Sequence, residues 1–273
     1  MTELEQLAGF LARHRKVLVL SGAGISTASG IPDYRDAQGV RRGKMPVQGP
    51  EFRTSDAVRR RYWARSMVGW PTMAKAAPNA GHRALAALEA AGKLDAVLTQ
   101  NVDGLHQRAG SAHVLELHGS IHAVVCLDCH AKFSRAFIQS LLQDANPAMA
   151  NASAVALPDG DAQLEPEALA AFRVPHCVHC AGTLKPDVVF FGDGVSPACT
   201  EAALALTARA DALLVVGSSL MVYSGFRFCR MAAESGKPIA AINLGKTRAD
   251  HLLALKIEAS AERILPGLLA RLN

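Results

Sequence analysis

The spacing of two cysteine pairs is the feature of this sequence that most directly indicates a chemical role. Cys-Leu-Asp-Cys begins at residue 126 and Cys-Val-His-Cys begins at residue 177, so two residues separate the thiols of each pair. Such a turn directs two sulfurs toward one ion, and four thiolates form the closed tetrahedral shell of structural zinc. We therefore expect one structural Zn²⁺ ion, with the ligands Cys126, Cys129, Cys177 and Cys180. A thioredoxin-like redox pair and ordinary buried thiols are the alternatives, but redox chemistry would need only one pair.

A glycine-containing loop is the second candidate for a functional site. The apolar run 17–20 leads into Ser-Gly-Ala-Gly at 21–24, which predicts a buried strand followed by a tight turn. Exposed amides of such a turn, at the start of a following helix, suit a phosphate group. The spacing differs from the dinucleotide fingerprint G-x-G-x-x-G because Thr27 stands at the third glycine position. The loop alone therefore also fits a turn without a ligand, although Pro-Asp-Tyr-Arg at 32–35 adds a carboxylate, a ring and a guanidinium beside it.

Polar residues follow further apolar runs that we predict to be strands. The predicted strands cover residues 96–99, 114–117, 212–216 and 239–242, with another at 188–191. The polar segments at their ends are 99–103, His118, 217–219 and 243–245. Ligands of parallel sheets bind in the crevice beyond the carboxyl ends of the strands. The convergence of these segments with the glycine loop predicts a site large enough for a nucleotide.

The elements that position these residues alternate between strands and helices. Thr2 and Glu5 form a capping box for a first helix, a second helix is expected from Ser55 to about Met67, and Asn79 caps a third. This alternation predicts a Rossmann-like α/β domain, with a mostly parallel sheet covered by helices on both faces. A small zinc-binding module is expected as an insert at about 121–186, and a mobile loop over the ligand at about 36–50.

Composition excludes several classes of protein. Half of the 273 residues are hydrophobic and 19% are charged, so the chain can bury a large core and is not globally disordered. The formal charge of +5 suits anionic ligands without requiring nucleic acid. No apolar run reaches the roughly 18 residues of a membrane span, and the N-terminus lacks the pattern of a signal peptide. We expect a cytoplasmic monomer with reduced cysteines that binds neither membranes nor specific nucleic-acid sequences.

Together these motifs resemble the sirtuin family. The resemblance covers nearly the whole chain, in the family's order, and rests on the segments 22–35, 99–103, 118–119, 185–192, 217–220, Asn243 and both cysteine pairs. Residues 61–65, 68–71 and 222–225 more narrowly resemble the class II branch that includes the mitochondrial sirtuin 4 type.

The resemblance implies an NAD-dependent protein-lysine deacylase that releases nicotinamide and O-acyl-ADP-ribose. His118 would be the general base for a ribose hydroxyl, with Asn101 as a second catalytic residue. An imidazole can take up a proton near neutral pH, which fits this role independently. The implied NAD-binding residues are Gly22, Ala23, Gly24, Ser26, Thr27, Asp33, Tyr34, Arg35, Thr99, Gln100, Asn101, Asp103, Gly217, Ser218, Ser219, Asn243, Leu244, Gly245 and Ala261.

The resemblance also implies an acyl-lysine peptide as substrate, added as a strand between 188–192 and 220–223. The residues expected to contact it are Val188, Val189, Phe190, Gly192, Leu220 and Val222. Tyr62 and Arg65 resemble the pair with which the sirtuin 5 type receives acidic acyl chains, but support of their helix is the equal alternative. ADP-ribosyl transfer at the same site, an NAD-dependent oxidoreductase and a noncatalytic zinc module are the rival functions.

Overall fold

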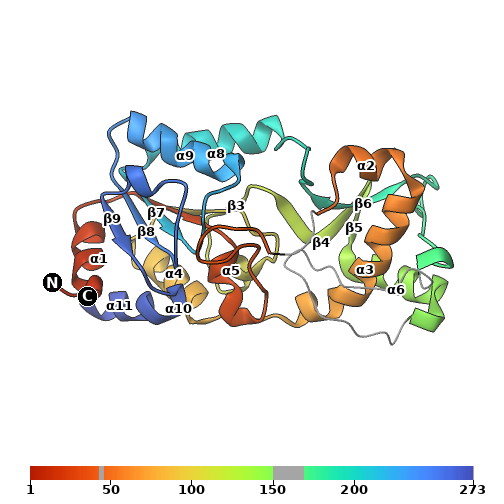
Figure 1. Cartoon of the computed structure of the whole chain (residues 1–273), viewed down its shortest axis with the longest axis horizontal. Coiled ribbons are helices and arrows are strands. Elements are labelled where there is room, and N and C mark those ends of the chain that lie inside the picture. Colours follow the sequence, from red (N-terminus) through yellow and green to blue (C-terminus); the bar gives the residue numbers. More distant parts are fainter. Residues whose placement is uncertain (43–45, 150–168, 273) are drawn as a thin grey trace.

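The computed structural model describes residues 1–42, 46–149 and 169–272. They form a larger lobe around a parallel sheet and a smaller lobe around an antiparallel sheet, placed side by side along the long axis of the molecule (Figure 1). No described helix combines the length and the apolar character needed to cross a bilayer.

Six parallel strands form the centre of the larger lobe, in the order β3-β2-β1-β7-β8-β9. Their bounds are β1 Val17–Ser21, β2 Ala96–Thr99, β3 Val114–Glu116, β7 Ala212–Val216, β8 Ile239–Ile242 and β9 Leu255–Ile257. Every residue of β1 is buried, as expected for a central strand covered on both faces. The strand order reverses direction at β1, so the end of β1 is the topological switch point where such sheets bind ligands. The predicted Rossmann-like α/β fold is confirmed.

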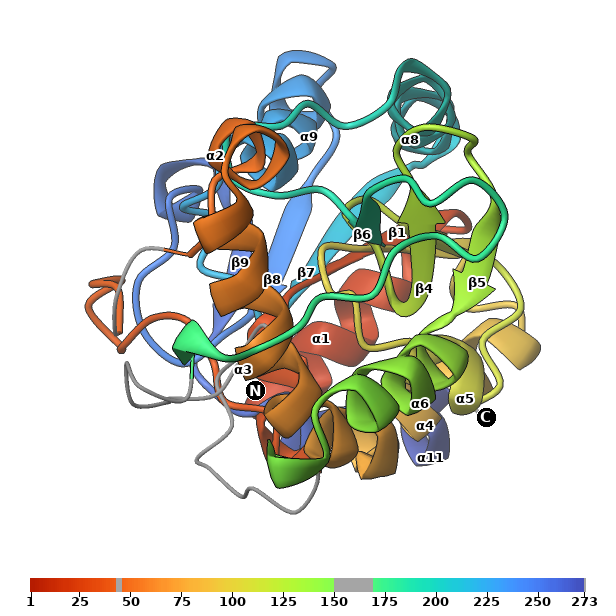
Figure 2. The same ribbon diagram turned by 90° about the vertical axis from the view of Figure 1, so that its right-hand side faces the viewer.

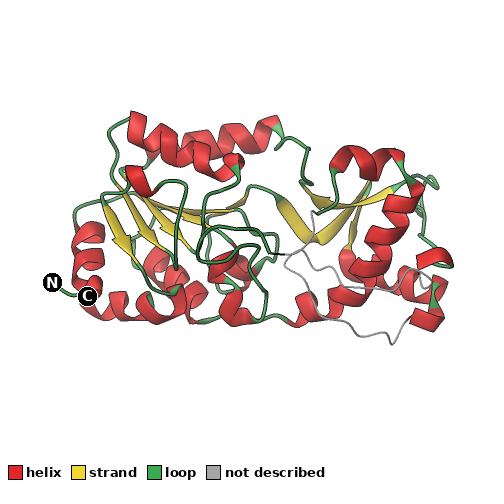
Figure 3. Ribbon diagram, viewed as in Figure 1, coloured by secondary structure: helices red, strands yellow, loops and turns green. Residues whose placement is uncertain are grey.

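Helices cover both faces of this sheet (Figure 3). One face carries α1 Glu3–Ala12, α4 Ala80–Ala90, α10 Ala261–Ile264 and α11 Pro266–Leu272, and the other carries α8 Pro197–Arg209 and α9 Tyr223–Glu234. Because strand side chains alternate between faces, Val19 packs beneath the first group and Leu20 beneath the second. The expected capping box of α1 is present, since Thr2 and Glu5 each bond the backbone of the other.

The smaller lobe joins two separate segments of the chain. One segment supplies β4 Gly119–Cys126, β5 Lys132–Ser134, α6 Arg135–Ala145 and β6 Leu184–Val188, with the sheet order β5-β4-β6. The other supplies α2 Gly49–Thr54 and α3 Asp56–Lys75, and Figure 2 shows α3 and α6 side by side. Trp63 of α3 is fully buried and its Nε1 donates to the Leu184 carbonyl at 3.2 Å. The predicted insert therefore packs with an earlier part of the chain, which the sequence did not indicate.

Several local predictions are corrected by the structure. The helix expected after the glycine loop is replaced by two 3₁₀ turns, η1 Ala23–Ile25 and η2 Thr27–Ser29. The strand expected at 188–191 is wrong, because the strand here is β6, which ends at Val188 and belongs to the antiparallel sheet. The remaining short elements are α5 Leu105–Arg108, η3 Pro147–Met149 and η4 Asp250–Leu252.

Two expected boundaries also change. Helix α3 continues through Pro71 to Lys75, well beyond Met67, because Trp70 and Met73 are also buried. The segment expected as a loop at 36–50 contains the start of α2 at Gly49, and its residues 43–45 lie outside the described residues. Residues 150–168 of the expected insert also lie outside them.

Candidate functional site

A cavity of about 700 Å³ lies between the two lobes, at the carboxyl edge of the parallel sheet. Its wall contains most residues expected to bind NAD, namely Gly22, Ala23, Gly24, Ser26, Asp33, Tyr34, Arg35, Gln100, Asn101, Asp103, Gly217, Ser218, Ser219, Asn243 and Leu244. His118 lines the same cavity. The structure thus brings together residues from five strand ends that are up to 222 positions apart in the chain, from 22 to 244.

The glycine loop owes its composition to close backbone packing. A Cβ on Gly22 would lie 2.7 Å from Ser218 Cβ, and one on Gly24 would lie 2.9 Å from the Gly217 carbonyl oxygen. Gly217 itself has a φ of +59°, which favours glycine. The amides of Gly22 and Gly24 donate to the carbonyls of Val216 and Gly217. The expectation that these two amides are exposed for a phosphate is therefore wrong in this state. The loop instead contributes Gly22, Ala23 and Gly24 to the cavity wall.

Asn101 and Asp103 are held together by Ser26. Ser26 Oγ donates to Asp103 Oδ2 at 2.7 Å, and Asn101 Nδ2 donates to Ser26 Oγ and to the Gly22 carbonyl, each at 3.1 Å. All three side chains are buried. A donor, a hydroxyl and a carboxylate are thereby fixed in orientation at one end of the cavity, which suits recognition of a polar ligand.

The histidine of the cavity is anchored at both ring nitrogens. His118 Nδ1 lies 2.9 Å from the Gln100 carbonyl oxygen, and Nε2 lies 2.8 Å from Ser224 Oγ. A carbonyl only accepts, so the neutral ring carries its proton on Nδ1 and has a lone pair on Nε2. Burial lowers the pKa of His118, the Gln100 hydrogen bond opposes this, and the Arg227 guanidinium lowers the pKa further. The ring is therefore an available base near neutral pH.

Four expected NAD-binding residues lie outside the cavity wall, and each supports it from behind or packs in the core. Thr99 Oγ1 accepts from the Asn101 amide at 3.1 Å, and Thr27 Oγ1 donates to the Gly24 carbonyl at 3.1 Å. Gly245 packs against the backbone of Ala37, where a Cβ would lie 2.1 Å from the carbonyl oxygen. Ala261 begins α10 within the hydrophobic core of the larger lobe.

The segment after the glycine loop folds over the cavity. Residues 35 and 41 form an antiparallel bridge, and Arg35 Nη1 donates to the Gly39 carbonyl at 2.9 Å. The Arg41 guanidinium lies 5.2 Å from the centre of the Phe191 ring and 5.8 Å from that of Tyr34. Arg41 thus joins the cavity wall between the lobes, a placement that the sequence motifs did not indicate.

Only one of the two residues considered for acyl recognition reaches the cavity. Tyr62 lines it and packs edge-on against Phe52 and Phe190, with ring centres 5.5 and 5.2 Å apart. Arg65, one turn further along α3, is half-buried and is not among the described residues that form the cavity wall.

The two segments expected to flank a peptide both line the cavity, but neither is a full strand. Val188, Val189, Phe190 and Gly192 form one side, and Leu220 and Val222 form the other. The Val189 amide donates to the His118 carbonyl at 2.9 Å, which brings the first segment beside the base. Leu220 has a φ of +57° and α9 begins at Tyr223, so the second segment is extended only briefly.

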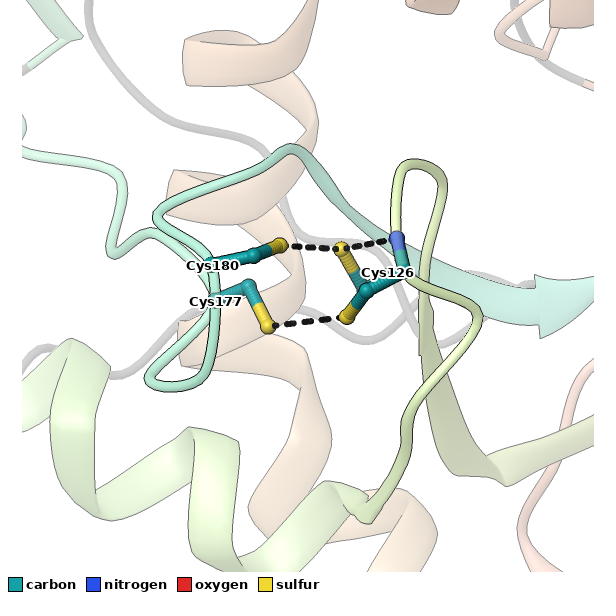
Figure 4. A group of neighbouring side chains, drawn as sticks. Cys126, Cys177 and Cys180 are labelled. Atoms are coloured by element: carbon teal, nitrogen blue, oxygen red, sulfur yellow. Dashed lines mark hydrogen bonds between the residues drawn. The ribbon is translucent and has the colours of Figure 1, made fainter.

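The four cysteines of the two C-x-x-C pairs meet at one point of the smaller lobe (Figure 4). Cys126 Sγ lies 3.5 Å from Cys180 Sγ, and Cys129 Sγ lies 3.7 Å from Cys177 Sγ. All four sulfurs lie within 4.8 Å of one another. Amides of Asp128 and Cys129 point to Cys126 Sγ at 3.4 and 3.5 Å, which stabilises a thiolate. The donor set fits a closed structural zinc site and leaves no side-chain position open for catalysis.

Comparisons with known proteins agree with this geometry. The Sir2 family model matches residues 22–224. A relative from Pseudomonas syringae pv. tomato, named NAD-dependent protein deacetylase 3, is 53% identical over 259 residues, which is 94% of this chain and 92% of the relative. A Bordetella bronchiseptica relative, named NAD-dependent protein deacetylase, is 51% identical over 265 residues, or 97% of both chains.

Solved structures give the same result at the level of the fold. A structure described as Sir2 bound to acetylated peptide has a TM-score of 0.78 and 28% identity, and the match covers 99% of this chain and 98% of that one. A structure concerned with the basis of sirtuin substrate affinity has a TM-score of 0.78 and 29% identity, with the same coverage. The chain therefore belongs to the Sir2, or sirtuin, family.

Proposed function

We propose that this protein is an NAD-dependent protein-lysine deacylase that transfers the acyl group from lysine to ADP-ribose. The observation that carries the proposal is His118, a half-buried imidazole with its lone pair on Nε2, inside a cavity walled by both lobes. The names of the Pseudomonas and Bordetella relatives support deacetylase activity. A neighbouring structure with acetylated peptide supports an acyl-lysine peptide as the substrate.

The residues of the cavity fit NAD. The loops at 22–24 and 217–219 form the floor at the topological switch point, and Asn243 supplies an amide nearby. Asn101, Ser26 and Asp103 hold donors and acceptors for ribose and carboxamide groups at the other end. When bound, NAD supplies an electrophilic ribose carbon, nicotinamide as its leaving group and a ribose hydroxyl.

The chain's own residues then have distinct roles. Residues 188–192 and 220–222 orient the peptide so that the acyl oxygen faces the ribose carbon. His118 accepts the proton of the ribose hydroxyl at Nε2, while the Gln100 carbonyl holds the Nδ1 proton in place. The Asp33–Arg42 ion pair, with its atoms 3.0 Å apart, fixes the segment that covers the site and excludes water.

The zinc site belongs to the same proposal in a structural role. Cys126 is the last residue of β4 and Cys129 lies in the turn that follows it, and Cys177 and Cys180 lie just before β6. A Zn²⁺ ion held by these four residues would join the neighbouring strands of the smaller lobe, which forms one wall of the cavity.

We also propose membership in the class II branch and a preference for longer or acidic acyl groups over acetyl. Tyr62 in the cavity wall supports acyl recognition, whereas the position of Arg65 makes its contribution depend on a rearrangement of α3. We propose that the protein is cytoplasmic, which six cysteines without a disulfide support, and that it acts as a monomer.

The acyl preference is tested with matched acetyl-, succinyl- and glutaryl-lysine peptides, by measuring nicotinamide release as kcat/KM. The proposal predicts at least a severalfold preference for an acidic chain and its loss in Tyr62→Phe or Arg65→Ala. Arg61→Ala is the matched control, because Arg61 is exposed on the same helix. Equal rates on all three peptides, unchanged in the Tyr62 and Arg65 variants, would contradict the acyl preference. The protein would then be a deacylase without selectivity among these acyl groups.

A further inference from the structure

Ser224 makes a contact with the general base that the proposed chemistry does not yet use. Its Oγ lies 2.8 Å from His118 Nε2, the atom that must accept the substrate proton. Because the Gln100 carbonyl fixes the ring proton on Nδ1, Nε2 can only accept in the neutral ring. The Ser224 hydroxyl must therefore donate to it. The base of the unliganded protein already has a hydrogen-bond donor on its reactive lone pair.

The fold places Ser224 there by a close approach of α9 to Gln100. Ser224 is the second residue of α9, and Gly225 follows it at a point where a Cβ would lie 2.3 Å from Gln100 Oε1. Gln100 is itself held by Ser218, whose Oγ accepts from Gln100 Nε2 at 2.8 Å. Gln100 therefore contributes to both hydrogen bonds of the His118 ring. Its backbone carbonyl accepts from Nδ1, and its side chain packs against the start of α9, the helix that carries Ser224.

We propose that Ser224 is a positioning residue for His118, which donates to Nε2 in the resting enzyme and accepts from Nε2 after proton transfer. This inference rests on the proposed deacylase function. A serine hydroxyl has one donor and two lone pairs, and it rotates about the Cβ–Oγ bond. In the unliganded site it fixes the plane of the ring. On entry of the ribose hydroxyl it rotates away from the lone pair.

The proton balance of the step is simple. The O–H bond of the ribose hydroxyl breaks and an N–H bond forms at Nε2, so the ring becomes an imidazolium with a proton on each nitrogen. The Gln100 carbonyl accepts from Nδ1–H, and Ser224 Oγ is the neighbouring acceptor for Nε2–H. Ser224 keeps its own proton throughout. A hydrogen bond to a charged partner is stronger than one to a neutral partner, so this contact favours the product of the transfer.

The role is tested by comparing Ser224→Ala with Ser224→Thr, which retains a hydroxyl. Ser235→Ala is the control, since Ser235 lies exposed at the other end of the same helix. We expect Ser224→Ala to lower kcat about tenfold, the range for loss of one hydrogen bond to a charged group. The KM values for NAD and for the peptide should change by less than about twofold, and Ser224→Thr and Ser235→Ala should match the wild type.

A second measurement on the unliganded protein does not depend on activity. Nitrogen-15 NMR reports both ring nitrogens of His118, whose signals are identified by their loss in His118→Gln. We expect Ser224→Ala to shift the Nε2 signal downfield, toward that of an acceptor without a donor, and to leave Nδ1 protonated. Thermal unfolding checks that each variant is folded.

The outcomes separate the two proposals. An unchanged Nε2 signal in Ser224→Ala, or an equal loss of kcat in Ser224→Thr, would overturn the role of Ser224 in an active enzyme. A wild-type protein that releases no nicotinamide with any acyl peptide would instead overturn the proposed function, and this role with it.

Discussion

At the scale of single residues, His118 carries the proposed chemistry, and its surroundings explain why. The protein has ten histidines, and at least two of them lie in environments unlike that of His118. His113 is exposed and pairs with Glu89 at 2.9 Å, whereas His106 is buried behind the cavity and bonds Ser21 Oγ at 2.8 Å. The imidazole of His118 lines the cavity with its basic Nε2, which Ser224 contacts in the unliganded protein, and the proposed chemistry places the ribose hydroxyl beside that nitrogen.

The first prediction compares two histidine variants. His118→Asn should lower kcat by about 10²- to 10⁴-fold, the usual contribution of general base catalysis, with little effect on NAD binding. His113→Asn should retain full activity because His113 lies at the surface. Steady-state nicotinamide release, with NAD binding measured separately by calorimetry, checks both. Comparable activity of the two variants would show that the base is elsewhere.

At the scale of elements, the site depends on loops and helix starts that touch one another. Gly22, Gly24 and Gly217 allow the β1 and β7 ends to pack backbone against backbone. Gly225 allows α9 to approach the side chain of Gln100. The catalytic arrangement is therefore a property of how these elements approach, because no single segment contains it.

The second prediction concerns that approach. Gly225→Ala should force the end of the Gln100 side chain to move and break its hydrogen bond to Ser218 Oγ, which should destabilise the protein by about 1 kcal/mol and lower kcat by loosening the contact of α9 with Gln100. Gly9→Ala is the control, since a Cβ there meets nothing closer than 3.6 Å. In the middle of α1 it should stabilise by about 0.5–1 kcal/mol. Urea unfolding measures both, and a neutral Gly225→Ala would contradict the close approach.

The third prediction concerns the metal site. The purified protein should contain one zinc ion per chain, and Cys177→Ser should lower the zinc content and the unfolding temperature together. Cys199→Ser is the control because Cys199 lies outside the four-cysteine cluster. Elemental analysis and thermal unfolding decide the matter. A zinc-free protein with unaltered stability and activity would reject a structural zinc.

The sequence predicts those elements whose pattern is local. The apolar runs of β1, β2, β7 and β8 and the caps of α1 and α4 appear where expected, because burial and capping act over a few residues. The strand at 188–191 was misplaced because the Val-Val-Phe-Phe run has high β-propensity, but only Val188 is part of a strand. Local propensity does not determine which sheet a segment joins.

The sequence predicts the candidate site less completely than the fold. The motifs located His118, both cysteine pairs and most of the cavity wall. They did not locate the Ser224 contact, because it joins residues 106 positions apart. They also placed Ala261 at the ligand, whereas its small side chain serves core packing in α10.

At the scale of the whole molecule, the cavity exists because the chain crosses repeatedly between two lobes (Figure 1). It leaves the larger lobe after β1, returns at α4, and leaves again after β3. Each crossing contributes to the wall, so a change in either lobe alters the site. Global stability and activity should therefore be closely coupled.

The fourth prediction concerns the pH dependence of that stability. Burial lowers the pKa of His82 to about 4 and that of His106 to about 3. The unfolded chain takes up these protons near pH 6.5, so below that pH it binds more protons than the folded chain. Stability should therefore fall as the pH falls from 6.5 toward 4, by about 2 kcal/mol per histidine at pH 5.

Urea unfolding at pH 7 and pH 5 checks this dependence. His106→Asn should remove about half of the pH-dependent loss. A free energy of unfolding that is the same at both pH values would show that the two imidazoles are not buried in neutral form.

The most direct test of the proposed function is the stoichiometry of a single reaction. Purified protein is incubated with NAD and an acyl-lysine peptide, and all products are quantified by mass spectrometry. The deacylase proposal predicts equal amounts of nicotinamide, deacylated peptide and O-acyl-ADP-ribose, no NADH, and loss of all three products in His118→Asn. Formation of NADH, or nicotinamide release with ADP-ribosylated protein and an intact acyl-lysine, would contradict it.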